Sequence, residues 1–261
     1  MVNLRSKRAV IAATVVTFAL SSTVALATHS WGGYHWARTA NPFTLKVGDN
    51  VTATWDSYLA TTVSDWSQST VVDAAIIPGA GGKSCKPGAG RVEVCNAKYG
   101  RNGWLGIASV WAVGQHITQG TVKMNDTYFN TPTYNTPAWR NLVMCQEVGH
   151  TLGLDHQDED FSNTPLGTCM DYSNDPNPNQ HPNFHDYEML ETIYAHLDAT
   201  TTVAASTATS LPDINTEDPK NWGKEIRKSA DGRASLHEKD FGNGRKLFTF
   251  VFWEDGRAER H

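Results

Sequence analysis

The spacing of apolar residues predicts mainly strands in the first half of the chain. Alternating apolar and polar positions over 47–55 are typical of a half-buried strand. Apolar positions three or four residues apart over 59–72 favour a helix. Short apolar runs predict further strands, over 74–77, 92–94, 104–113 and 120–125.

Two helices are predicted in the second half. Thr136 is a good N-cap and Pro137 suits the first helical turn, so a helix should begin there. It should run to about Leu152 and end at Gly153, because glycine often follows the last turn of a helix. Apolar residues at 3–4 spacing predict another helix over 185–197.

The N-terminal residues have the order of a secretory signal. Three basic residues within 5–8 precede an apolar stretch over 9–20, and small residues follow up to Ala27. This predicts a signal peptide over 1–27 and an extracellular, oxidising location. An uncleaved anchor is the alternative, but polar residues at 21–23 interrupt a run already shorter than the roughly 20 apolar residues of a spanning helix.

The remaining chain divides into three parts. Residues 28–197 contain most of the predicted elements and form the main domain. Residues 198–211 are rich in Thr, Ala and Ser without a core pattern, which is typical of a linker. Residues 212–261 contain glycine turns and one clear strand, 246–253, and form a small β-rich segment.

Composition narrows the possible partners. Hydrophobic residues make up 39% and charged residues 19% of the 261 positions, as in a globular protein. The net charge of −5 gives no general attraction to nucleic acid or anionic membrane. We therefore expect no nucleic-acid partner, no stable membrane insertion and a monomer.

Four cysteines permit three pairings. Cys85 and Cys95 flank a turn-rich insert that would let a hairpin close on itself, which leaves Cys145 to pair with Cys169. Closing these two loops would stabilise the fold by about 2.7 and about 3.5 kcal/mol. No two cysteines lie two to four residues apart, which argues against a four-Cys zinc knuckle.

One short segment concentrates the candidate chemistry. On a helix, Gln146 and His150 lie about one turn apart, so both side chains can reach one metal ion. Gly153 would end the helix and let the chain turn back, bringing His156 to the same point. Glu147 is placed to hold a metal-bound water as general base.

This segment resembles the extended zinc motif of the metzincin metallopeptidases, His-Glu-x-x-His-x-x-Gly-x-x-His, over eleven positions. Gln146 stands where the motif has its first histidine. Residues 167–172 then resemble the Met-turn that lies under the metal in that clan. The resemblance covers roughly 31–197 and is closest to secreted, matrixin-like enzymes.

The resemblance implies an α+β fold: a twisted mixed sheet with an active-site helix, a Met-turn and a C-terminal helix, here followed by a small β-rich tail. It implies that the strand around 105–113 is the sheet edge that pairs with extended substrate. The implied activity is that of a secreted zinc endopeptidase, which hydrolyses protein or peptide substrates through a metal-activated water.

The resemblance also assigns roles to single residues. His150 and His156 would bind the metal, Glu147 would be the general base, and Met170 would be the hydrophobic floor. Tyr172 stands where some metzincin families have a tyrosine that binds zinc or steadies the tetrahedral intermediate, although matrixins lack it.

Gln146 leaves three outcomes open, because zinc favours an amide oxygen less than an imidazole nitrogen. The amide could bind through its oxygen with support from Tyr172. Another residue could complete the site, namely Asp155, His116 or His185. In the third outcome the site is empty and the protein is a peptidase-like scaffold.

The alternative function is a weak or inactive metzincin-like protein that acts as a binding module for protein or cell-wall glycan. Exposed aromatics would supply its surface: Trp31, Tyr34, Trp36, Trp222, Phe241 and Trp253. Core packing is the simpler explanation of these residues.

The remaining polar residues carry no motif. The acidic run 158–160 is typical of a solvated loop, with a calcium site as the alternative. The histidines outside any motif are predicted at the surface: His29, His35, His181 and His237.

Overall fold

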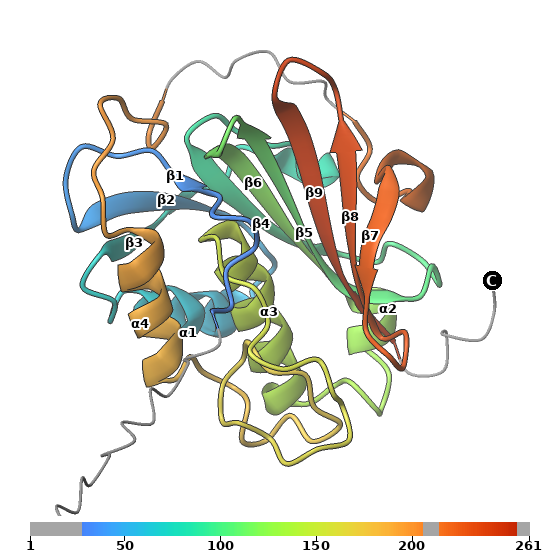
Figure 1. Ribbon diagram of the computed structural model, residues 1–261. Coiled ribbons are helices and arrows are strands. Elements are labelled where there is room, and N and C mark those ends of the chain that lie inside the picture. Colours follow the sequence, from blue (N-terminus) through green and yellow to red (C-terminus); the bar gives the residue numbers. More distant parts are fainter. Residues whose placement is uncertain (1–27, 206–213, 255–261) are drawn as a thin grey trace, which may run out of the picture.

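The computed structural model describes residues 28–205 and 214–254 (Figure 1). The predicted signal peptide and part of the predicted linker lie outside these ranges. Nine strands form one mixed sheet: β1 His35–Trp36, β2 Phe43–Asn50, β3 Val72–Pro78, β4 Arg91–Ala97, β5 Trp104–Val113, β6 His116–Asn125, β7 Lys224–Lys228, β8 Ala234–Asp240 and β9 Arg245–Trp253. The α-helices of the described residues are α1 Asp56–Trp66, α2 Asp126–Phe129, α3 Pro137–Thr151 and α4 Phe184–Ile193.

The sheet has a parallel and an antiparallel half. Its order is β3-β2-β4-β6-β5-β9-β8-β7, and β1 pairs with the start of β6. Neighbours are parallel from β3 to β6 and antiparallel from β6 to β7. Figure 1 shows α1 and α3 against one face, and the main core fills the space between these helices and the sheet. The predicted α+β class with a large mixed sheet is confirmed.

The strongest local signals predicted the elements around the motif correctly. The hydroxyl of Thr136 caps α3 by accepting a hydrogen bond from the amide of Trp139 at 3.3 Å. The helix ends at Thr151, and Gly153 adopts a φ of +99° just beyond it. The strand predicted over 104–113 is β5.

Several elements begin or end away from their predicted bounds, among them β2, α1, β6 and α4. β2 begins at Phe43 instead of position 47, because Phe43 and Leu45 alternate into the core. α1 begins at Asp56 and ends at Trp66, and the Ser67 hydroxyl then bonds to backbone groups of Val63 and Ala74.

α4 ends at Ile193 instead of continuing to 197. The Tyr194 hydroxyl donates to the carbonyl oxygen of Leu152, and the Tyr194 carbonyl accepts hydrogen bonds from Arg38 and Asn41. Tertiary contacts thus replace the next helical turn.

The C-terminal strands continue the main sheet. β9 pairs antiparallel with β5 from one end to the other. The prediction that the strand over 105–113 is a free sheet edge is therefore wrong. The physical reason is the alternation in β9: Phe248, Phe250 and Phe252 enter the main core, while Val251 packs with Trp104 on the opposite face.

The first part of the predicted linker also packs against the domain. The amide of Thr202 donates to the carbonyl of Ala37, and the amide of Ala204 donates to that of Gly90. Residues 198–205 therefore follow the surface of the sheet domain.

Both predicted disulfides are present. Cys85 and Cys95 have a Cα–Cα distance of 6.0 Å, and Cys145 and Cys169 have one of 5.9 Å. The second bridge fixes the loop that contains Met170 to α3. Within the residues described, none of the helices has the length and apolar character needed to cross a bilayer.

Candidate metal centre

The C-terminal half of α3 places three polar side chains in a buried position. Gln146, Glu147 and His150 are each at most 1% exposed. The carboxylate of Glu147 accepts a hydrogen bond from the backbone amide of Ala108 on β5. Gly106 on the same strand allows this approach, since a Cβ there would lie 3.0 Å from a Glu147 oxygen.

The turn after α3 brings the second histidine back to the first. A side chain at Gly153 would collide with the backbone oxygen of Tyr34, so only glycine fits this positive-φ position. The rings of His150 and His156 then lie 4.6 Å apart and nearly perpendicular, at 87°. The predicted convergence of these two imidazoles is present.

Each imidazole is oriented through its Nδ1 atom. His150 Nδ1 lies 2.9 Å from the carbonyl oxygen of Leu154, and His156 Nδ1 lies 3.1 Å from a carboxylate oxygen of Glu159. An acceptor at Nδ1 fixes the proton there and leaves the lone pair on Nε2. Both rings therefore have the tautomer that a metal-binding histidine needs.

Several polar atoms at this point are buried without a hydrogen-bond partner. They are Gln146 Oε1 and Nε2, Glu147 Oε2 and His156 Nε2. An unsatisfied buried polar group costs about 1–3 kcal/mol, and native proteins contain few of them. Two imidazoles are donors that zinc prefers, and an amide oxygen is a weaker one. The donor set therefore fits a zinc ion.

Burial controls the protonation of the site. It raises the pKa of Glu147 well above the ordinary value, although the amide of Ala108 acts in the opposite direction. Burial, followed by the neighbouring His156, lowers the pKa of His150 well below its ordinary value. His150 is thus a neutral imidazole, the form that binds metal.

Met170 and Tyr172 both pack next to the residues of the motif. A Cβ at Gly149 would lie 2.5 Å from Met170 Sδ, so the methionine packs directly against α3. Tyr172 is 1% exposed and its ring is 4.1 Å from that of His156. Burial and then the charge of Glu147 raise the pKa of Tyr172 well above its usual value, which keeps its phenol protonated.

Two of the other candidates for a third ligand are engaged elsewhere. His116 lies 3.2 Å from Asp198, and His185 stacks on His29 at 4.7 Å. Asp155 binds the guanidinium of Arg227 on β7 through both carboxylate oxygens, and one of them also lies 3.5 Å from His156 Nδ1. Asp155 and Gln146 are thus the candidates that remain near the two histidines.

The acidic run divides its contacts among different partners. Glu159 pairs with His156 and Arg227, whereas Asp158 and Asp160 accept hydrogen bonds within their own exposed loop. A calcium site over 158–160 stays a prediction.

Strand β9 covers the centre. The ring of Phe250 stacks on that of His150, with centroids 4.0 Å apart and an angle of 11°, and Phe252 lies 5.0 Å from Tyr172. Sequence reasoning missed Phe250 and Arg227. The alternating phenylalanines of β9 were the available signal, since they mark a strand with one buried face.

Comparison of the chain with known proteins gives no family: no family model matches it, and no curated protein is significantly similar to it. The proposed function therefore rests on the sequence motif and the geometry of the centre, and not on similarity to known proteins.

Proposed function

We propose that this chain is a secreted zinc endopeptidase of the metzincin type. Its ligands would be Gln146, His150 and His156, with Glu147 as the general base. The observation that carries the proposal is the group of buried, unpartnered donor atoms beside two pre-oriented imidazoles. A bound zinc would supply a Lewis acid that makes water a nucleophile at neutral pH.

The residues around the metal have separate parts in this proposal. Glu147 would accept a proton from the attacking water and return it to the leaving amine, a role favoured by its raised pKa. The amide of Ala108 orients this carboxylate. The protonated phenol of Tyr172 is suited to donate a hydrogen bond to the developing oxyanion.

The closed arrangement limits how substrate can enter. An extended peptide would bind by pairing with β5, but β9 already occupies that edge. We therefore assign the structure to a latent form, in which the C-terminal strands must leave β5 before a substrate can bind. The ion pair of Arg227 with Asp155 is one contact that keeps them closed.

An inactive, binding form of the same fold is the second candidate. It is favoured by Gln146 in place of a stronger ligand and by the stacking of Phe250 on His150. The expected aromatic surface is smaller than the sequence suggested, because Trp31, Trp36 and Trp222 are buried. Core packing explains these three residues.

Casein hydrolysis and metal analysis separate the two candidates. We expect slow, chelator-sensitive hydrolysis by the purified protein and faster hydrolysis by Gln146→His. His181→Ala is the control, since His181 is an exposed residue that pairs with Asp65. If Gln146→His binds zinc at this centre but neither it nor Phe250→Ala hydrolyses casein, the peptidase proposal is wrong and the binding module is favoured.

A further inference from the structure

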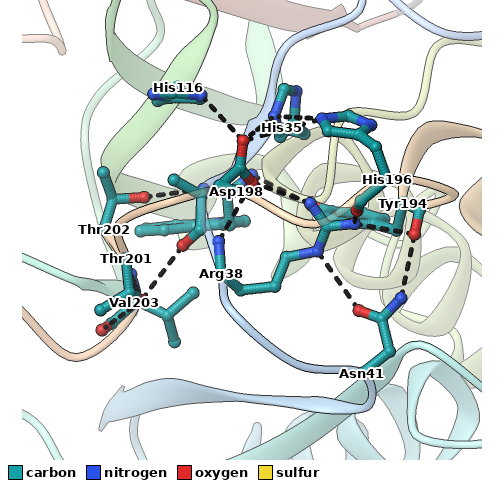
Figure 2. Close-up of polar contacts among 12 residues, drawn as sticks. His35, Arg38, Asn41, His116, Tyr194, His196, Asp198, Thr201, Thr202 and Val203 are labelled. Atoms are coloured by element: carbon teal, nitrogen blue, oxygen red, sulfur yellow. Dashed lines mark hydrogen bonds and ion pairs between the residues drawn. The ribbon is translucent and has the colours of Figure 1, made fainter.

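A second group of imidazoles gathers at the β1 end of the sheet (Figure 2). It consists of His35, His116, His196 and Asp198. The Nε2 atoms of His35 and His196 lie 3.1 Å apart. Asp198 Oδ1 lies 3.2 Å from Nε2 of His116, 3.5 Å from that of His35 and 3.7 Å from that of His196. The ligand atoms of His35, His196 and Asp198 thus all lie within 4.8 Å of one another, and His116 contacts the same carboxylate oxygen from outside that group.

The fold assembles this group from three distant segments. His35 on β1 is the register partner of His116 on β6, so the parallel pairing places their side chains together. His196 and Asp198 follow α4, and the amide of Asp198 donates to the carbonyl of Arg38. Because α4 ends at Ile193, the segment that follows it can reach the residues next to β1.

Neighbouring groups orient the ligand atoms toward the centre. His35 Nδ1 donates to the carbonyl oxygen of Gly33 at 2.9 Å, which leaves the lone pair on Nε2. Asp198 Oδ2 accepts hydrogen bonds from the side chain of Arg38 at 2.9 Å and from its backbone amide at 3.2 Å. Oδ1 is therefore the oxygen that faces the imidazoles. Such outer contacts are typical of metal ligands.

The spacing also matches a tetrahedral ion. Ligands about 2.0–2.1 Å from zinc stand about 3.3 Å from one another in a tetrahedron. The three distances among His35, His196 and Asp198, 3.1–3.7 Å, bracket this value. Without a cation, the lone pair of His35 Nε2 would face both a carboxylate oxygen and another imidazole nitrogen.

We propose that His35, His196 and Asp198 form a second zinc site, separate from the centre on α3. Three protein ligands would hold the ion, and His116 would orient the carboxylate of Asp198 from outside the group. The ion joins β1 to the segment after α4. It thereby fixes the N-terminal strand to the end of the 28–197 region.

The site is open to solvent on one side. The side chains of His116 and His196 are 39% and 54% exposed, whereas that of His35 is 5% exposed. Zinc can therefore enter and leave the folded protein. The exposed ligand His196 and its neighbour His116 can also be replaced without opening the core.

Elemental analysis of the full chain tests the site. After reconstitution with zinc and dialysis, we expect His116→Ala/His196→Ala to hold one zinc fewer than the unmodified protein, with zinc affinity at this site at least 100-fold weaker. His181→Ala is the matched control, because its side chain is also 54% exposed. Equal zinc content in the double variant and the unmodified protein would overturn the proposal.

Two further measurements distinguish the two centres. His156→Ala should remove only the zinc of the α3 centre, so the two sites can fail independently. Anomalous scattering at the zinc edge from crystals of the unmodified protein should give a peak between His35 Nε2 and Asp198 Oδ1. Its absence after zinc soaking would exclude the site even if the double variant does not fold.

Discussion

The histidines of the α3 centre are neighbours in the sequence, whereas those at the β1 end are far apart. His150 and His156 are six positions apart, and one helix end with one glycine turn brings them together. His35 and His196 are 161 positions apart and meet only through the completed sheet and α4. A cluster of histidines can thus arise from local geometry or from the whole fold, and only the first kind leaves a motif.

The two groups also differ in their exposure to solvent and in whether their polar atoms have hydrogen-bond partners. The α3 centre is buried under β9, and several of its donor atoms have no partner. The β1 group is partly exposed, and its buried carboxylate oxygen is bonded to Arg38. We therefore attribute chemistry to the first group and stabilisation of the fold to the second.

The largest effect is expected from Glu147→Gln. Removing the general base should lower casein hydrolysis about 10²–10⁴-fold, because an amide cannot accept the proton. Zinc content of both groups should stay unchanged, since Glu147 is a ligand in neither. The loss is best measured as initial rates of casein hydrolysis in the Gln146→His protein, because its starting rate is expected to be higher. Unchanged rates would show that the α3 group takes no part in the hydrolysis.

Phe250→Ala should both destabilise the protein and open the α3 centre. Truncating a buried phenylalanine costs about 3–5 kcal/mol of unfolding free energy. Loss of its stacking on His150 should also increase casein hydrolysis relative to the unmodified protein. Urea denaturation and initial rates measure the two effects. A destabilised variant without increased activity would contradict the latent form.

Phe248→Ala is the matched control for this change. Phe248 is on the same strand and similarly buried, but its ring packs against those of Trp31 and Tyr34. We expect a similar loss of unfolding free energy without direct exposure of His150.

Gln146→His should change the zinc affinity of the α3 centre and leave that of the β1 group as it is. An imidazole in the third position should strengthen zinc binding at the α3 centre by about 10–100-fold, in line with the sensitivity of such sites to their ligands. The β1 group should bind zinc as before. Competition with a chelator of known affinity measures both. Equal affinities before and after the change would show that position 146 does not bind the metal.

The smallest effect is expected from Arg227→Ala. The guanidinium of Arg227 binds Asp155 from a half-exposed position, so its loss should cost about 1 kcal/mol or less after solvent screening. It should nevertheless loosen β7 and speed proteolysis of the C-terminal strands. Limited proteolysis with Lys228→Ala as control tests this.

The sequence predicted helix α3 and the turn after it well, because their geometry is local. Thr136 caps the helix, residues 146 and 150 lie one turn apart, and Gly153 supplies a positive φ. The disulfides and β5 were predicted for similar reasons, since turn-rich inserts and apolar runs are visible in short windows.

The sequence alone determined the helix that contains Gln146, Glu147 and His150, the glycine turn and most of the strands, because capping, periodicity and backbone preference act over a few residues. Only the tertiary structure decided that β9 covers β5 and that His35 and Asp198, predicted at the surface and in a linker, share one partly exposed cluster. Alternation reveals which face of a strand is buried but not which strand lies beside it. Contacts between distant segments depend on how the whole core closes, and no short window of sequence contains that information.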